Sequence, residues 1–185
     1  MNVDAFMMND KVFRKLLAYP TALRILDYFA GMPGKELYGR LLGTETKTSV
    51  GASNQAARFL CEAGFLKRAR KGKEYYYSAE NNALLRSFKI FSSICRLSPI
   101  LALLEPVSES IYLYGSSAQG ENHEKSDVDL LLIVRDRKTS ESKIKKAKLP
   151  EKISVMVKTV DEILFMKRSD PALYENAMLK GIRLK

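Results

Sequence analysis

The sequence has only two cysteines, Cys61 and Cys95, and no long hydrophobic run. Two cysteines so far apart fit neither a disulfide framework nor a CxxC metal pair, so both are expected to be buried apolar fillers in a reducing cytoplasm. No apolar run approaches the roughly 20 residues that cross a bilayer, which predicts no membrane association. The start, MNVDAFMMND, is acidic and lacks the basic region of a secretory signal. These absences favour a cytoplasmic globular protein.

The positive charge is uneven along the chain, whose total is +10 over 185 residues. Residues 1–98 contain 16 Lys and Arg against 8 Asp and Glu, a net charge of +8, whereas residues 99–185 carry a net charge of +2. A basic half joined to a nearly neutral half indicates that the first half contacts a polyanion. The length fits one ordinary domain or two small ones.

The N-terminal half reads as helices followed by a hairpin. A first helix is predicted over Lys11–Ala18, with Asp10 as its N-cap, and a second over Thr21–Ala30. A short helix over Lys35–Leu42 and a polar helix over Ser49–Ala63 follow. The next stretch, FLKRARKGKEYYYS, predicts two strands joined by a basic turn at residues 71–73.

This order resembles the winged helix-turn-helix domains of small prokaryotic regulators of the ArsR-like type, over residues 20–78. The matching features are the short helix KELYGRLLG, the polar helix after it, and the wing EAGFLKRARKGKEYYYS. The resemblance implies that Ser49–Glu62 is a recognition helix in the major groove and that the wing tip lies over phosphates or the minor groove. Winged helices also serve as protein-interaction modules. The DNA contacts predicted from these side-chain types are Ser53, Asn54, Gln55, Arg58, Lys71 and Lys73.

A connector is predicted between the two halves, as a helix over Asn82–Leu97 that Pro99 ends. Leu84, Phe88, Phe91 and Cys95 form one apolar stripe, which packs on both domains or on its copy in a homodimer. The expected organisation is a winged helix over residues 1–80, a connector over 81–104 and a second domain over 105–185.

The second domain contains the stretch with the clearest chemistry, IYLYGSSAQGENHEKSDVDLLLIV at residues 111–134. Gly115 and Ser116 follow one apolar run, and Asp127 and Asp129 begin another. Residues i and i+2 of a strand face the same way, so the two carboxylates are expected to point together. They repel unless a cation lies between them, and Mg²⁺ is the expected ion because it prefers hard oxygen ligands.

The Gly-Ser pair, the loop length and the Asp-x-Asp pair together resemble the signature of the DNA polymerase β-like nucleotidyltransferase superfamily, above all the minimal nucleotidyltransferases. The resemblance covers roughly residues 105–185. It implies that Gly115 and Ser116 bind the phosphates of a nucleoside triphosphate, with ATP expected, and that Asp127 and Asp129 hold Mg²⁺, or Mn²⁺, for transfer to a hydroxyl. The acceptor is a protein side chain, a small molecule or a nucleic acid end.

The third carboxylate that this family uses is missing from the sequence. The family pattern in the strand KISVMVK would put it at Ser154, and the sequence leaves open whether Asp161 or Glu162 replaces it. The expected fold is α+β, with a winged helix followed by a small mixed-sheet nucleotidyltransferase domain. Two functions remain open, an Mg²⁺-dependent nucleotidyltransferase coupled to DNA binding, and a DNA-binding transcriptional regulator whose transferase domain is catalytically degenerate. A weaker third reading is one partner of a toxin–antitoxin pair.

Overall fold

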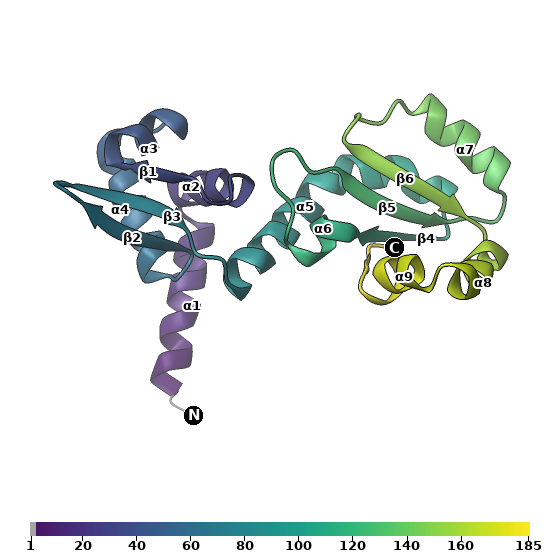
Figure 1. The fold of residues 1–185 in the computed structure, drawn as a ribbon, viewed down its shortest axis with the longest axis horizontal. Coiled ribbons are helices and arrows are strands. Elements are labelled where there is room, and N and C mark those ends of the chain that lie inside the picture. The colour runs from purple at the N-terminus through teal and green to yellow at the C-terminus, as the bar shows by residue number, and fades with distance from the viewer. Residues whose placement is uncertain (1–2) are drawn as a thin grey trace. The chain divides into compact units, whose positions relative to one another are not determined.

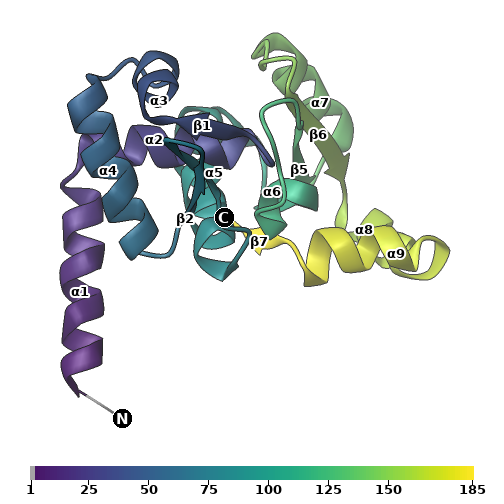
Figure 2. The same cartoon turned by 60° about the vertical axis from the view of Figure 1, so that its left-hand side comes forward.

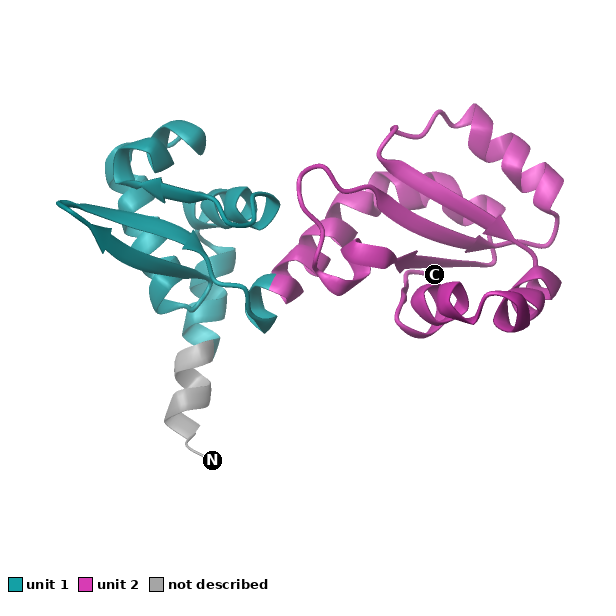
Figure 3. Cartoon of the chain, in the orientation of Figure 1, with its two compact units in different colours: residues 1–85 teal, residues 86–185 magenta. Residues whose placement is uncertain are grey.

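The computed structural model describes the backbone of residues 3–185 and the side chains of residues 10–185. It divides into two compact units, residues 1–85 and 86–185 (Figure 3). Each unit has its own sheet and its own core, and the fold is α+β, as the sequence predicts.

The first unit is built from helices and a three-stranded antiparallel sheet of order β1-β3-β2. Its core contains fully buried side chains from three helices and one strand, among them Ile25, Phe29, Leu42, Leu60 and Tyr77. Its elements, in chain order, are α1 (Val3–Leu17), α2 (Pro20–Gly31), β1 (Glu36–Tyr38), α3 (Gly39–Glu45), α4 (Val50–Glu62), β2 (Leu66–Lys71) and β3 (Glu74–Ala79). Helix, strand, two helices and a hairpin, from α2 to β3, form the topology of a winged helix-turn-helix (Figure 1).

Two predicted helix boundaries in this unit are wrong. Asp10 is not an N-cap, because α1 begins at Val3 and Asp10 lies inside it. The helix predicted over 35–42 begins only at Gly39, since residues 36–38 pair instead with β3 as strand β1. The N-cap of α4 is Ser49, whose hydroxyl accepts a hydrogen bond from the Ala52 amide.

The second unit surrounds a four-stranded mixed sheet of order β6-β5-β4-β7, in which only β5 and β6 run parallel. Its elements are α5 (Ala83–Leu104), which begins in the first unit, η1 (Glu105–Val107), β4 (Ser110–Tyr114), α6 (Gly115–Gln119), β5 (Val128–Ile133), α7 (Arg137–Lys146), β6 (Ile153–Lys158), α8 (Val160–Ser169), α9 (Pro171–Tyr174), η2 (Glu175–Leu179) and β7 (Ile182–Arg183). One face of the sheet packs on α5 and α7, and the other packs on α8, α9 and η2 (Figure 1).

Helix α5 is longer than the sequence predicts, because it continues through Pro99 to Leu104. Leu97 and Leu104 lie on either side of the proline and are both buried in the sheet core, so packing holds the helix together across it. The segment Ala83–Val107 is consequently long and apolar enough to cross a membrane, by length and composition only. The expectation that no segment reaches that length is therefore wrong, although core helices of soluble proteins pass the same test.

Candidate functional site

Three strands of the second unit bring a row of polar side chains to one face of the sheet. Tyr114 at the end of β4 pairs with Asp129 on β5, and Asp129 pairs with Ser154 on β6. Directly paired residues project to the same face, so these three side chains are neighbours. The Ser154 hydroxyl is hydrogen-bonded to the Asp129 carboxylate. Asp127 lies immediately before β5 and is exposed, whereas Asp129 is half-buried.

Gly115 lies against this row with its backbone. Its φ of +69° is in the left-handed region, and a Cβ added there would lie 2.7 Å from Oδ2 of Asp129. A side chain at this position would collide with the carboxylate, so only glycine allows the chain to turn beside it. Ser116 follows and is half-buried in the first turn of α6. Gly115, Ser116 and Asp129 therefore lie together where the sequence predicts a nucleotide site.

The electrostatics of the row are set by Asp129. Burial, and next the charge of Asp127, raise the pKa of the Asp129 carboxyl, while the hydrogen bond from Ser154 opposes that rise. Burial and then the charge of Asp129 raise the pKa of the Tyr114 hydroxyl. Sequence reasoning missed Tyr114, although its position directly before Gly115 at a strand end was a usable signal. A cation between Asp127 and Asp129 would relieve the repulsion that their mutual approach creates.

The loop between α6 and Asp127 packs against α5. Gly120 has a φ of +67°, and a Cβ there would lie 2.4 Å from the Arg86 carbonyl oxygen. Nδ2 of Asn122 donates to the Ser93 hydroxyl at 3.4 Å. Burial lowers the pKa of the Lys89 amine on the same face of α5, and the nearby Glu121 opposes that effect. Helix α5 therefore supports the loop that joins the two parts of the candidate site, which no sequence pattern indicated.

The predicted DNA-contacting residues of α4 divide into exposed and buried ones. Ser53 is fully buried and its hydroxyl donates to the Val50 carbonyl at 3.0 Å, so the prediction that Ser53 contacts DNA is wrong. Asn54 is half-buried, and its Nδ2 donates to the same carbonyl at 2.9 Å. Gln55 and Arg58 are exposed and line, with Asn54, a cavity of about 460 Å³ beside α1.

The wing carries exposed cations on β2 and in the turn that follows it. Lys71 forms an ion pair with Glu36 and its Nζ lies 5.1 Å from the Tyr76 ring, while Lys73 is exposed in the two-residue turn. The guanidinium of Arg68 lies 4.4 Å from the Tyr75 ring. Arg68 is a further exposed cation of this surface, and sequence reasoning did not single it out.

Comparison with known proteins finds a family match in the second unit. Residues 94–184 match the family model for the nucleotidyltransferase domain. This segment is therefore similar to the nucleotidyltransferase domain family. The match begins inside α5, so the helix that supports the loop is in part a component of the nucleotidyltransferase domain. No curated protein matches the chain.

Solved structures similar to the chain cover about half of it. The homodimeric winged helix-turn-helix DNA-binding domain of a possible ArsR-family transcriptional regulator from Mycobacterium bovis is 21% identical, with a TM-score of 0.44, over 51% of this chain and 85% of its own. NolR from Sinorhizobium fredii is 20% identical, with a TM-score of 0.40, over 51% of this chain and 89% of its own. The winged-helix assignment itself rests on the element order and sheet of the first unit.

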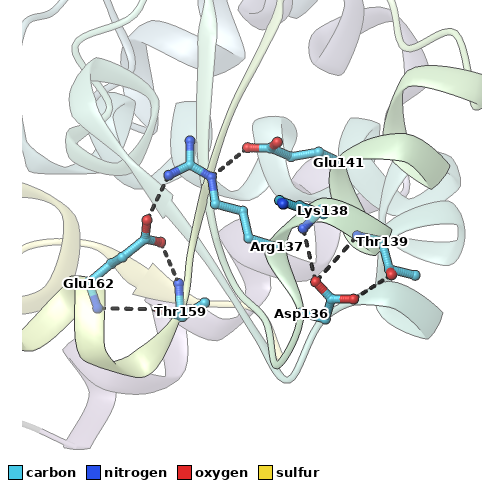
Figure 4. A network of polar contacts seen from close by, with 7 residues as sticks. All are labelled: Asp136, Arg137, Lys138, Thr139, Glu141, Thr159 and Glu162. Carbon is cyan, nitrogen blue, oxygen red and sulfur yellow. Dashed lines mark hydrogen bonds and ion pairs between the residues drawn. The ribbon is translucent and has the colours of Figure 1, made fainter.

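The nucleotidyltransferase domain departs from its family pattern at the third acidic position. Ser154 occupies the register position beside Asp129, as predicted from the sequence. Glu162 does not replace the missing acid, because it accepts from Arg137 at 2.6 Å and from the Thr159 amide at 2.8 Å (Figure 4). Within residues 10–185, no three Asp, Glu, His or Cys side chains gather as a metal-binding group. The donor set is thus two carboxylates, whose hard oxygens fit one Mg²⁺ completed by water and phosphate oxygens.

Proposed function

We propose that the nucleotidyltransferase domain transfers a nucleoside monophosphate from a nucleoside triphosphate, with ATP as the expected donor, to a hydroxyl group, with Mg²⁺ or Mn²⁺ as the cofactor. The observation that carries the proposal is the close approach of the Gly115 backbone to Asp129, 2.7 Å from an added Cβ to Oδ2. This approach puts a side-chain-free backbone, which a triphosphate can approach, next to a carboxylate pair suited to a divalent cation.

Each residue of the site has a defined role in this reaction. Asp127 and Asp129 hold the divalent ion, which, when bound, neutralises charge on the α-phosphate and on the leaving pyrophosphate. The Gly115 backbone and the Ser116 hydroxyl orient the phosphates. The hydroxyl hydrogen bond from Ser154 fixes the orientation of the Asp129 carboxylate. Tyr114, largely buried beside Asp129, limits the access of water from the β4 side.

The test is label transfer from α-labelled nucleoside triphosphates in Mg²⁺ or Mn²⁺, with Asp129→Asn compared with Asp161→Asn. Asp161 is an exposed acid in the first turn of α8 and, within residues 10–185, does not gather with Asp127 and Asp129 into a group of three acids, so its substitution removes the same charge away from the row. We expect transfer to disappear in Asp129→Asn and to persist in Asp161→Asn. Equal transfer by both variants would exclude this site as the catalytic one.

We propose in addition that the winged helix binds DNA through Asn54, Gln55 and Arg58 of α4 and through Lys71 and Lys73 of the wing. The exposure of Gln55, Arg58 and Lys73 and the basic charge of the first half support this. The exposed side chains Phe91 and Leu103 of α5 support a homodimer, which would present two recognition helices to two half-sites. Such a protein would work in the cytoplasm, where its DNA and nucleotide partners are found.

A second function is that of a DNA-binding regulator whose nucleotidyltransferase domain binds nucleotide without catalysis. The presence of Ser154 in the polar row, where the family has an acid, favours this function. A serine hydroxyl cannot supply the charge of a third carboxylate to a second metal ion. Ser154→Asp distinguishes the two functions. Transfer that appears only in Ser154→Asp would favour the regulator, whereas transfer by the unchanged protein would favour the enzyme.

A further inference from the structure

Strand β6 is an open edge of the transferase sheet. The Val128 amide donates to the Lys152 carbonyl at 2.8 Å, and the Val134 amide donates to the Lys158 carbonyl at 2.9 Å. The even-numbered residues from Lys152 to Lys158 therefore direct their backbone amide and carbonyl groups toward β5. In a parallel ladder the odd-numbered residues then direct theirs outward. The Ile153 amide donates to Pro150, whereas the amide and carbonyl groups of Val155 and Val157 have no hydrogen-bond partner within the described part of the chain.

A groove runs along this edge. Its volume is about 630 Å³, and it is lined by residues 154–158 and by Arg137, Glu141, Ile144 and Lys145 of α7. Helix α7 lies beside β6 (Figure 2). Tyr114 and Ser154 also line the groove, and each of them is a direct register partner of Asp129 in the sheet. The groove therefore extends from the unpaired backbone groups to Tyr114 and Ser154, the two neighbours of Asp129 in the sheet.

The rim of the groove is basic. Arg137 is neutralised by Glu141 and Glu162, at 2.7 and 2.6 Å (Figure 4). Lys145 and Lys158 form no ion pair with any residue that the structure describes. Two lysines beside an unpaired strand edge complement an extended, acidic peptide. The backbone groups of the edge can form hydrogen bonds with the peptide backbone, and the lysines attract the peptide carboxylates.

We propose that β6 binds an extended acidic segment of a partner protein as an additional strand, and that a hydroxyl side chain of this segment is the acceptor of the nucleotidyl group. The proposal rests on the transferase function proposed above and selects the protein side chain among its three acceptor classes. Main-chain pairing along β6 would hold the segment, and residues facing the polar row would project toward Asp129.

The reaction is balanced by a single displacement. The peptide hydroxyl oxygen forms a bond to the α-phosphorus, the bond from that phosphorus to the bridging oxygen breaks, pyrophosphate leaves, and the hydroxyl proton passes to solvent. Adjacent strands lie about 4.8 Å apart, so the added strand would lie roughly 10 Å from the Cα of Asp129, with only Ser154 between them. A small neutral residue there leaves the path to the carboxylates open and does not repel an acidic segment, as an aspartate would.

The test uses the full chain and a fluorescein-labelled peptide of about ten residues that alternates threonine and glutamate, a composition with strand propensity, acidity and hydroxyls. Val155→Pro removes the outward amide without breaking the ladder to β5, because proline is tolerated at an edge position. Val155→Ala is its control, since it removes side-chain volume and keeps the amide. We expect Val155→Pro to weaken peptide binding about fivefold or more, in line with one lost hydrogen bond, and Val155→Ala to weaken it less than twofold.

Two further comparisons complete the test. Lys145→Gln should weaken binding of the peptide, whereas Lys146→Gln, a neighbour that does not line the groove, should not. In an NMR titration with the unlabelled peptide, the amide resonances of Val155 and Val157 should shift. The same peptide with alternate backbone amides N-methylated should leave both resonances in place.

Several outcomes would overturn the proposal. The first two are equal peptide binding by Val155→Pro and Val155→Ala, and no binding at about 1 mM peptide. The other two are tighter binding of an oligothymidylate in the same groove, and pairing of β6 with a second copy of the chain that excludes the peptide. Nucleotide binding, measured in parallel with Asp129→Asn as the control, separates the two proposals. Loss of peptide binding with intact Asp129-dependent nucleotide binding rejects only the strand-edge acceptor, whereas peptide binding without nucleotide binding rejects the transferase function.

Discussion

At the scale of single residues, the pKa of the Asp129 carboxyl would set the pH range in which the proposed divalent ion binds. Burial and the charge of Asp127 raise its pKa, and a proton competes with the ion for the carboxylate. As the pH falls, protonation of Asp129 therefore begins at a higher pH than for an ordinary aspartate, and we expect affinity for the proposed ion to be lost there.

Ser154→Ala should move this limit further upward. The hydrogen bond from Ser154 lowers the pKa of Asp129, so its removal raises that pKa and shifts the loss of Mn²⁺ binding to higher pH. The measurement is the titration of the Asp129 carboxyl carbon by ¹³C NMR without metal, with Mn²⁺ affinity against pH alongside. Ser98→Ala, on an exposed turn of α5, is the control. A midpoint that stays or falls in Ser154→Ala would contradict the assigned hydrogen bond.

Gly115→Ala should damage the protein more than the same change at another glycine with positive φ. Gly34 has a φ of +77° and nothing within 4 Å of an added Cβ, so Gly34→Ala costs only backbone strain, about 1–2 kcal/mol. Gly115→Ala adds a collision with Asp129 at 2.7 Å. Urea unfolding of the full chain, followed with one probe in each unit, measures both changes in stability.

The Gly115 change should also abolish nucleotide binding, because the methyl group displaces the carboxylate or the backbone that approaches the phosphates. Gly34→Ala, in the other unit, should leave nucleotide binding unaltered. Equal losses of stability in the two variants, together with normal nucleotide binding by Gly115→Ala, would remove the argument for a close approach at this site.

At the scale of elements, α5 shows why sequence periodicity and breaker residues are incomplete guides. A proline in a helix interior lacks an amide and costs about 3 kcal/mol, so ending the helix before Pro99 was the reasonable prediction. Burial of Leu97 and Leu104 in the sheet core outweighs that cost, and such tertiary packing is not visible in a single sequence. The strand Glu36–Tyr38 was missed for the same reason, since its pairing partner is about 40 residues away.

Pro99→Ala should therefore stabilise the transferase domain. Pro99 is exposed in the interior of α5, so alanine restores a helical hydrogen bond without disturbing the core, and a gain of up to about 3 kcal/mol is expected. Thermal unfolding monitored in the transferase domain measures it, with Ser98→Ala as the neighbouring control. A destabilised Pro99→Ala variant would indicate that the proline fixes a bend that the core requires.

At the scale of the whole molecule, the two units have different folds, and the sequence was sufficient to predict this difference. The charge difference, the wing with its basic turn, and the spacing of Gly115, Asp127 and Asp129 are local features that a sequence displays. The buried position of Ser53, the support of the Gly120 loop by Arg86, and the open edge of β6 depend on which side each element presents to its neighbours. A single sequence does not display those features.

Binding of duplex DNA by the full chain should be steeply salt-dependent through the wing. Lys73→Ala should reduce the slope of log K against log salt by about 0.9, the value for one phosphate contact. Arg135→Ala is the control, because this exposed cation lies in the transferase domain. Fluorescence anisotropy from about 50 to 200 mM salt gives both slopes. A reduced slope in Arg135→Ala alone would indicate that DNA contacts the second unit instead of the wing.

The open edge of β6 has a further consequence for how the molecule stays monodisperse while folding. An unpaired edge is a template for uncontrolled pairing with other chains. Native proteins limit this aggregation by keeping such edge strands short and placing lysine on them. Strand β6 is six residues long, with Lys152 immediately before it and Lys158 as its last residue. These two lysines repel a second copy of the same edge, so high salt, which screens them, is the condition under which aggregation would start at this strand.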